Sequence, residues 1–141
     1  MKGFGTVQDL YYWVANGELD TLLILQNYFS ALYPAVNTET DGTVSLYDQD
    51  GNPLGSLPFS IAHCGSARFR VSSLLEELKS PTGHTFGTLE VSIAIPQGVL
   101  SHIKDRKPHY FWDRFYIAYV NGQGQTCFVH GVDRTHIQQV G

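Results

Sequence analysis

His130, Asp133 and His136 are the side chains in this sequence whose types and spacing come closest to a metal site. Two imidazoles and a carboxylate are the ligands of a two-histidine, one-carboxylate centre for zinc or a similar ion. On an extended strand, however, His130 and His136 share one face while Asp133 points to the other. A turn at Gly131 would have to bring the three together, and the spacing matches no named metal motif. We favour an ordinary strand end here and keep a metal-dependent enzyme as the third-ranked function.

Asp48, Asp50 and Asn52 repeat the alternate oxygen ligands that open a calcium loop. The twelfth position of such a loop needs a bidentate glutamate, and this chain has Phe59 there. Aspartate, asparagine and glycine are also the residues that a tight turn requires. We therefore interpret the segment as a turn between two strands.

His63 and Cys64 are an adjacent pair that resembles a nucleophile with its base. Neighbouring residues of a strand point to opposite faces, so this histidine is not expected to activate the thiol. The sequence also lacks a nucleophile elbow, a phosphate-binding loop and a dinucleotide fingerprint. We expect no enzyme and no cofactor.

The segment 110–121 reads as a long aromatic strand with large apolar groups on both faces. The candidate ligand-binding or interface residues are Trp13, Tyr110, Trp112, Arg114 and Tyr116. If one face of this strand covers the core, the other leaves apolar area for a neighbour. The first-ranked function is therefore a homo-oligomeric, non-enzymatic module for assembly, scaffolding or signalling contacts with a protein partner. The alternative is a small-ligand module for carbohydrate, with the tryptophans and tyrosines as stacking platforms.

The elements that position these residues are short strands separated by turn residues. The pattern predicts an all-β fold, an antiparallel β-sandwich of about eight strands with one short helical turn, in a single domain over 1–141. The predicted strands are 10–15, 19–28, 43–48, 54–61, 66–71, 86–95, 110–121 and 125–132.

Several local sequence features predict specific structures. Asn16 and Gly17 favour a hairpin turn that pairs the first two strands. Pro58 indicates an edge or bulge position, because proline cannot donate to the ladder. Ser72 or Ser73 is expected to cap a helical turn at 74–78. The segment 29–42 reads as an exposed loop, and 133–141 shows no clear period.

Composition limits the classes of partner. The chain has 141 residues, 43% of them hydrophobic and only 16% charged, with nine Lys and Arg and a net charge of −4. Too few cations are present for a general nucleic-acid surface. No apolar run reaches the ~18 residues of a membrane span, and no leader is evident, so we expect no membrane insertion and a cytoplasmic protein. Cys64 and Cys127 are expected to be buried free thiols, with a disulfide as the alternative.

Two segments have a recognisable sequence pattern: 47–55, which reads YDQDGNPLG, and 69–74, which reads FRVSSL. They resemble the strand, turn, strand and short-helix block of bacterial β-sandwich proteins of the sensory rhodopsin transducer family. The segments 23–27 and 91–96 are similar to the preceding and following strands of that family. The resemblance covers about half of the chain and implies a compact, oligomeric, non-enzymatic sandwich that binds a partner or small ligand. The segment 29–42 and the aromatic C-terminal strands depart from the family pattern, so no functional residue is carried over.

Overall fold

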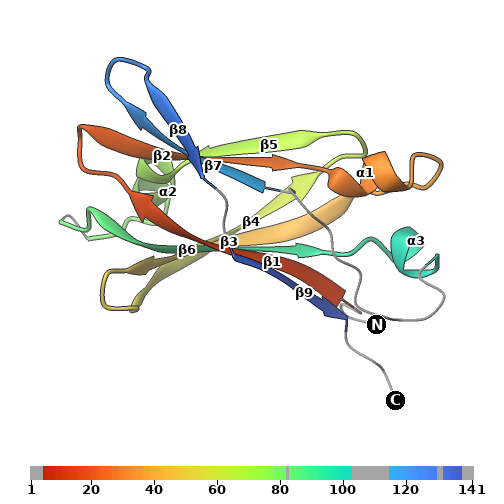
Figure 1. The fold of residues 1–141 in the computed structure, drawn as a ribbon. Coiled ribbons are helices and arrows are strands. Elements are labelled where there is room, and N and C mark those ends of the chain that lie inside the picture. The colour runs from red at the N-terminus through yellow and green to blue at the C-terminus, as the bar shows by residue number, and fades with distance from the viewer. Residues whose placement is uncertain (1–4, 82, 103–114, 130–131, 138–141) are drawn as a thin grey trace.

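The computed structural model describes residues 5–81, 83–102, 115–129 and 132–137. Two antiparallel sheets face each other as the two layers of a sandwich (Figure 1). The strand order is β4-β3-β6-β1-β9 in one sheet and β5-β2-β7-β8 in the other. The predicted all-β sandwich is thus confirmed, with nine strands in the described ranges where the sequence predicted about eight.

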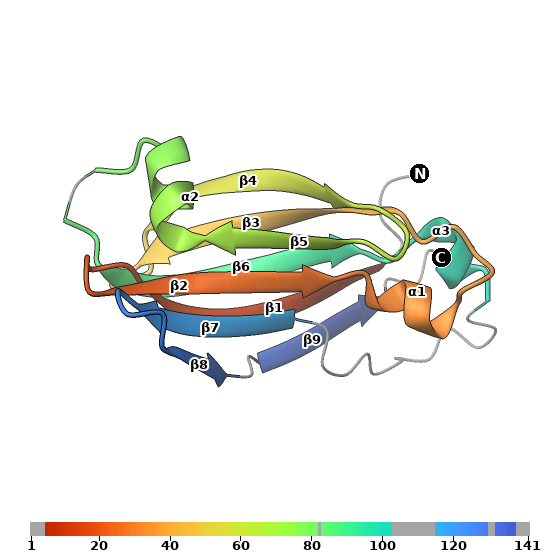
Figure 2. The ribbon, with the colours of Figure 1, turned by 90° about the horizontal axis from the view of Figure 1, so that it is seen from above.

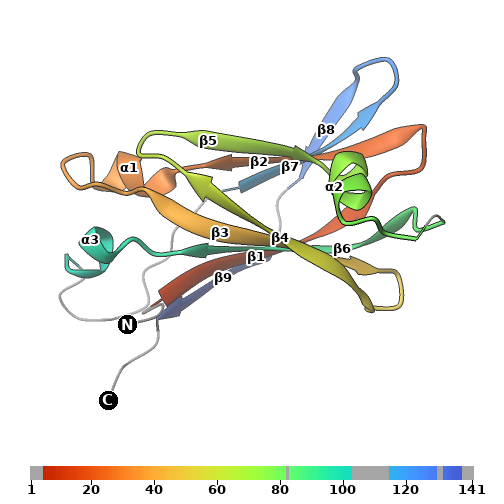
Figure 3. The ribbon, with the colours of Figure 1, turned by 180° about the vertical axis from the view of Figure 1, so that it is seen from behind.

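Five of the predicted segments, from 19–28 to 86–95, match strands whose bounds differ from them by three residues or fewer, whereas the first strand begins at Gly5 instead of Leu10. The five-stranded sheet contains β4 (Pro53–Ile61), β3 (Thr40–Asp48), β6 (Phe86–Ala94), β1 (Gly5–Val14) and β9 (Val132–Ile137). The four-stranded sheet contains β5 (Ser66–Arg70), β2 (Leu19–Gln26), β7 (Phe115–Asn121) and β8 (Thr126–Val129). Three short helices, α1 (Tyr28–Leu32), α2 (Val71–Glu77) and α3 (Gln97–Leu100), join them. Helices α1 and α3 lie at one end of the sandwich and α2 lies at the other (Figures 2 and 3).

The core lies between the two sheets and follows from period-two patterning. Along β2, Leu23 and Leu25 have no exposed surface, while the alternate residues Leu22 and Ile24 are half-buried on the outer face. Strand β6 alternates in the same way, with Leu89, Val91 and Ile93 facing inward. Alternate side chains of a strand point to opposite faces, so each sheet supplies one layer of the core. Pro58 lies on the edge strand β4, as predicted.

The predicted hairpin between the first two strands is wrong, because β1 and β2 belong to different sheets. Strand β1 is already paired on one side with β6 and on the other with β9. It therefore has no edge left for β2. The Asn16–Gly17 turn forms as expected, with Gly17 at φ +87°, but it carries the chain from one layer to the other. The Thr21 hydroxyl closes this corner by accepting from the Val14 amide and donating to the Val14 carbonyl, both at 2.8 Å.

The expectation of an exposed loop over 29–42 holds only in part: residues 33–39 are irregular and half of the segment is exposed. The segment contains α1 and the start of β3, and Phe29, Ser30 and Thr38 are buried. The Asn27 amide holds the segment by donating to the carbonyls of Thr38 and Ala62, at 2.7 and 2.9 Å. Polar residues can be buried when their groups find hydrogen-bond partners, which composition alone does not reveal.

The tail was expected to lack a period, yet Val132–Ile137 forms β9 and pairs antiparallel with β1. The register places Gly5 opposite Ile137, so the beginning and the end of the described chain lie side by side. An unpaired edge of β1 accounts for this, because it can pair with a segment whose own pattern is weak.

Candidate functional site

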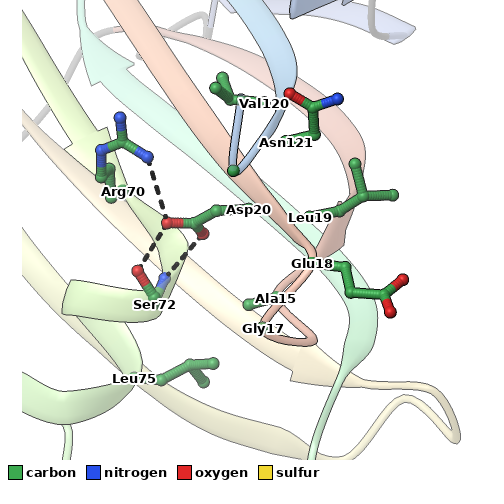
Figure 4. Close-up of a pocket in the computed structure, with 11 residues that line it drawn as sticks. Ala15, Gly17, Glu18, Leu19, Asp20, Arg70, Ser72, Leu75, Val120 and Asn121 are labelled. Atoms are coloured by element: carbon green, nitrogen blue, oxygen red, sulfur yellow. Dashed lines mark hydrogen bonds and ion pairs between the residues drawn. The ribbon is translucent and has the colours of Figure 1, made fainter. Parts of the chain in front are cut away.

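A pocket of about 430 Å³ lies at the α2 end of the sandwich (Figure 4). Its walls come from the β1–β2 turn, the turn between β7 and β8, and the first residues of α2. The polar lining residues are Glu18, Asp20, Arg70, Ser72 and Asn121, and the apolar ones are Ala15, Leu19, Leu75 and Val120. The volume falls within the range of small-molecule sites in proteins.

Asp20 is the centre of the hydrogen bonds in this pocket. Its Oδ1 accepts from the amides of Thr21 and Ser72 at 2.9 and 3.1 Å. Its Oδ2 accepts from the Ser72 hydroxyl at 2.6 Å and lies 3.6 Å from a guanidinium nitrogen of Arg70. These contacts place the carboxylate over the first turn of α2, where a negative charge is favourable.

Asp20 therefore caps α2 from a neighbouring strand, and the predicted local cap is wrong. The helix begins at Val71 rather than 74, and the side chain of its own N-cap residue, Arg70, makes no capping hydrogen bond. Ser72 lies inside the first turn and donates to Asp20 instead of capping the helix itself. The carboxylate is thus committed to structure, and we assign it no role as a general base.

Arg70 leaves a positive group at the mouth of the pocket. Its side chain is 52% exposed, and Asp20 is its only charged partner among the described residues. Arg68 lies two positions earlier on β5 and is also exposed. The register places Arg70 opposite Leu22 and Arg68 opposite Ile24. The two arginines therefore border the outer side of the four-stranded sheet.

The outer side of this sheet is apolar in its middle. We define the outer apolar face as the surface formed by Leu22, Ile24, Tyr116, Ala118, Val120 and Phe128. Ala118 lies opposite Leu22 on one side and Phe128 on the other, and Ile24 lies opposite Tyr116. Ala118 has no exposed surface, whereas Phe128 is 59% exposed. Val120, which lines the pocket, belongs to the same face, so the pocket and the outer apolar face are continuous.

The residues predicted for ligand binding or an interface lie in different places. Tyr116 is half-buried on the outer apolar face, in the row of Ile24. Tyr110, Trp112 and Arg114 lie outside the described residues. Trp13 is not available to a ligand, because its ring lies in the core with 1% of its surface exposed. Its Nε1 donates to the Tyr47 carbonyl at 2.9 Å, which is the usual way in which a buried tryptophan satisfies its polar atom.

The metal set stays a prediction. His130 lies outside the described residues, and the structure describes Asp133 and His136 only as backbone positions of β9, opposite Asp9 and Thr6. Within the part of the chain that the structure describes, no group of three or more His, Cys, Asp and Glu residues could hold a metal ion.

Asp48 shows the predicted turn in place of a calcium loop. Its Oδ1 accepts from the amides of Asp50 and Asn52 at 2.9 and 2.8 Å, and its Oδ2 from the Asn52 side chain at 3.0 Å. These hydrogen bonds, first of all the one from the Asn52 side chain, lower the pKa of the carboxyl below its ordinary value.

Both cysteines are free thiols, as expected, but they are exposed and not buried. Cys64 lies in the turn between β4 and β5, at φ +57°, and its amide donates to the Ser30 hydroxyl at 2.7 Å. This places the thiol outside the core even though the residues around it read as strand. Cys127 lies on β8, whose residues 126–128 are all exposed.

A buried chain of hydroxyls was not found by sequence reasoning. The Ser30 and Thr38 hydroxyls are 2.7 Å apart, and Thr38 lies 2.8 Å from Nδ1 of His63. Ser30 and Thr38 are 6% and 0% exposed, so neither hydroxyl is accessible to a substrate. The three residues are far apart in sequence, and no local pattern joins them. We infer that these hydrogen bonds hold α1 against the β4–β5 turn.

A comparison of the chain with protein-family models, with curated proteins and with solved structures found no match. No helix among the described residues is long and apolar enough to cross a membrane.

Proposed function

We propose that this protein is a homo-oligomeric interaction module that associates through the outer apolar face. The observation that carries the proposal is the exposure of Phe128, 59%, within a row of apolar side chains on neighbouring strands. An exposed aromatic ring that continues into a contiguous apolar surface is typical of a contact with another protein.

A second copy of this chain is the partner that fits best. The apolar side chains occupy the middle of the face, on β2, β7 and β8, and the two arginines occupy one border on β5. An apolar centre with a polar rim is the usual arrangement of an interface. The pocket that continues this face also holds the exposed Glu18, so a second copy offers a carboxylate to these arginines.

The pocket at the α2 end supports binding better than catalysis. Its carboxylate, Asp20, is held by hydrogen bonds to α2, and its remaining charged groups, Glu18 and Arg70, are exposed. The one hydroxyl in its lining, on Ser72, donates to Asp20, whose carboxylate is already used to cap α2. We therefore propose a binding module rather than an enzyme.

The test is the molar mass in solution at micromolar concentration, measured by light scattering during size-exclusion chromatography. We expect the unmodified protein to be a dimer or larger, and Phe128→Glu to be a monomer, because the new charge would be buried without a partner. Phe86→Glu is the matched control. Phe86 is 51% exposed on the other sheet, so this variant should keep the mass of the unmodified protein.

A monomeric unmodified protein contradicts the proposal. The same holds if Phe128→Glu and Phe86→Glu lower the mass to an equal extent, because the effect would then not belong to one face.

A further inference from the structure

The outer side of the five-stranded sheet carries a second surface, and its chemistry is different. Aromatic side chains gather at one end, where Tyr12 is 76% exposed and Phe86 is 51% exposed. Tyr47 lies in the same area, because Tyr12 and Tyr47 are both opposite Thr88, one on each side of it. Strands are about 4.8 Å apart, so the two tyrosines are separated by about 9.5 Å with a threonine hydroxyl between them.

The opposite end of this surface is a hollow lined by hydroxyl groups. Its volume is about 550 Å³, and its polar lining residues are Thr6, Asp41, Thr43, Ser60 and Ser92. The Ser60 hydroxyl donates to the Asp41 carboxylate. Between the two ends, the hydroxyls of Ser45 and Ser56 lie 2.8 Å apart. We call the whole surface the hydroxyl-aromatic face.

The backbone beneath the tyrosines is held by the side chains of Tyr119, which is half-buried, and Trp13, which is buried. The Tyr12 carbonyl accepts from the Tyr119 hydroxyl at 2.8 Å, and the Tyr47 carbonyl accepts from Nε1 of Trp13 at 2.9 Å. Gly87 makes the second contact possible, because a Cβ there would lie 2.0 Å from the Tyr47 carbonyl oxygen and 2.9 Å from Nε1 of Trp13. The positions that carry the two rings are therefore fixed before any ligand arrives, which lowers the entropic cost of binding.

Charge and shape indicate the ligand class. Within β1, β3, β4 and β6, the strands that carry the rings and the hollow, the charged residues on the outer side are Asp41 and Glu90. On β9, the neighbouring strand, Arg134 lies opposite Gln8. The two carboxylates make the surface of β1, β3, β4 and β6 less favourable for an anionic ligand. A sugar ring presents an apolar C–H face, which packs on an aromatic ring, and hydroxyl edges, which need donors and acceptors. From Phe86 to Ala94 the surface extends along the nine residues of β6, about 27 Å, which is a length that suits an extended chain.

We infer that the hydroxyl-aromatic face binds a neutral oligosaccharide chain. The rings of Tyr12, Tyr47 and Phe86 contact the sugar units at one end of the ligand, with Tyr12 and Tyr47 on either side of it at the level of Thr88. The hydroxyl-lined hollow receives the units at the other end. This site is separate from the outer apolar face, because the two surfaces lie on opposite sides of the sandwich (Figure 1).

The test is calorimetric titration of the full chain with a panel of neutral hexasaccharides, namely cellohexaose, xylohexaose, mannohexaose, maltohexaose and chitohexaose, together with the anionic hexagalacturonate. We expect at least one neutral member to bind and hexagalacturonate not to bind. Tyr12→Ala should weaken the binding by about tenfold, and Tyr12→Phe, which keeps the ring, by less than about twofold. Leu32→Ala, which truncates an exposed apolar residue on α1 outside both surfaces, is the control and should leave the affinity unchanged.

Tyr12 is too exposed for its truncation to unfold the protein, and Phe86→Ala provides a second variant that should weaken binding in the same way. The inference is overturned if no neutral member of the panel binds, if only hexagalacturonate binds, or if Tyr12→Ala and Leu32→Ala bind equally well. None of these results depends on whether the protein forms oligomers.

Discussion

Several buried or half-buried polar side chains among the described residues serve to hold neighbouring elements in place. Asp20 caps a helix, Asp48 closes a turn, and Thr21 joins two strands at a corner. The hydrogen bonds that lower the pKa of Asp48 also make its carboxylate a weaker base. At the scale of the residue, the hydrogen bonds therefore distinguish aspartates with a structural role, such as Asp20 and Asp48, from acidic side chains that are exposed, such as Glu18 and Asp41.

The Asp48 turn leads to a prediction about pH. Because the pKa of Asp48 is lowered in the folded protein, its contribution to the free energy of unfolding is present above the unfolded-state value of about 3.9. It is lost as the pH falls through the lower folded-state value. Asp48→Asn should therefore lower the urea midpoint at pH 6, and the difference from the unmodified protein should shrink towards pH 3.

Asp50→Asn is the control for this experiment, since Asp50 is exposed at the tip of the same turn. A difference between Asp48→Asn and the unmodified protein that stays constant over the whole pH range would show that ionisation of Asp48 does not stabilise the fold.

At the scale of the element, helix α2 depends on a strand that precedes it by about fifty residues. Its seven residues are too few to be stable alone. Val71 and Leu74 anchor it in the core, and Asp20 satisfies the amide of Ser72 at its start. The helix therefore forms only when β2 and β5 are already side by side, as the pairing of Leu22 with Arg70 requires.

Asp20→Ala should consequently destabilise the protein by about 1–2 kcal/mol, the usual cost of losing a helix cap, measured by urea denaturation. Asp20→Asn keeps one oxygen that can accept from the amides and should cost less, since the ion pair with a half-exposed Arg70 contributes little. Glu18→Ala, in the same pocket but exposed, should leave the stability unchanged within about 0.5 kcal/mol. Equal losses for Asp20→Ala and Glu18→Ala would exclude the capping role.

At the scale of the whole molecule, the sandwich leaves two outer surfaces with different composition. The inner sides of both sheets are used by the core, so whatever the protein binds must contact an outer side, an end or an edge. One outer side is apolar with a basic border, and the other combines hydroxyls, carboxylates and exposed aromatic rings. The first fits a second copy of the chain, and the second fits a neutral polyhydroxylated ligand.

This separation predicts that the two proposed functions can be removed one at a time. Phe128→Glu should yield a monomer that still binds the neutral hexasaccharide with an affinity per chain within about twofold of the unmodified protein. Tyr12→Ala should keep the oligomeric mass and lose most of the sugar affinity. If Phe128→Glu abolishes both properties in a protein that remains folded, the two surfaces are not independent.

Much of the architecture was predictable because period-two patterning and turn residues act locally. Strands β3, β4, β5 and β6 lie within a few residues of the predicted segments, and the Asp48 turn joins β3 to β4. The candidate site was less predictable. Sequence reasoning selected Trp13 for its ring, although a ring on an inner position is buried, and it overlooked Tyr12, the exposed neighbour on the other face.

The sequence by itself determined that this chain forms short antiparallel strands with one face of each in a core, since alternation of side chains is a property of a single strand. Only the tertiary structure decided which strands share a sheet: β1 pairs with β6 and β9, and β2 pairs with β5 and β7. It also decided that Asp20 and Ser72 meet, and that Tyr12 and Tyr47 lie on either side of Thr88. The physical reason is that backbone pairing is nearly independent of side-chain type, so the choice of partner depends on how all the strands pack together.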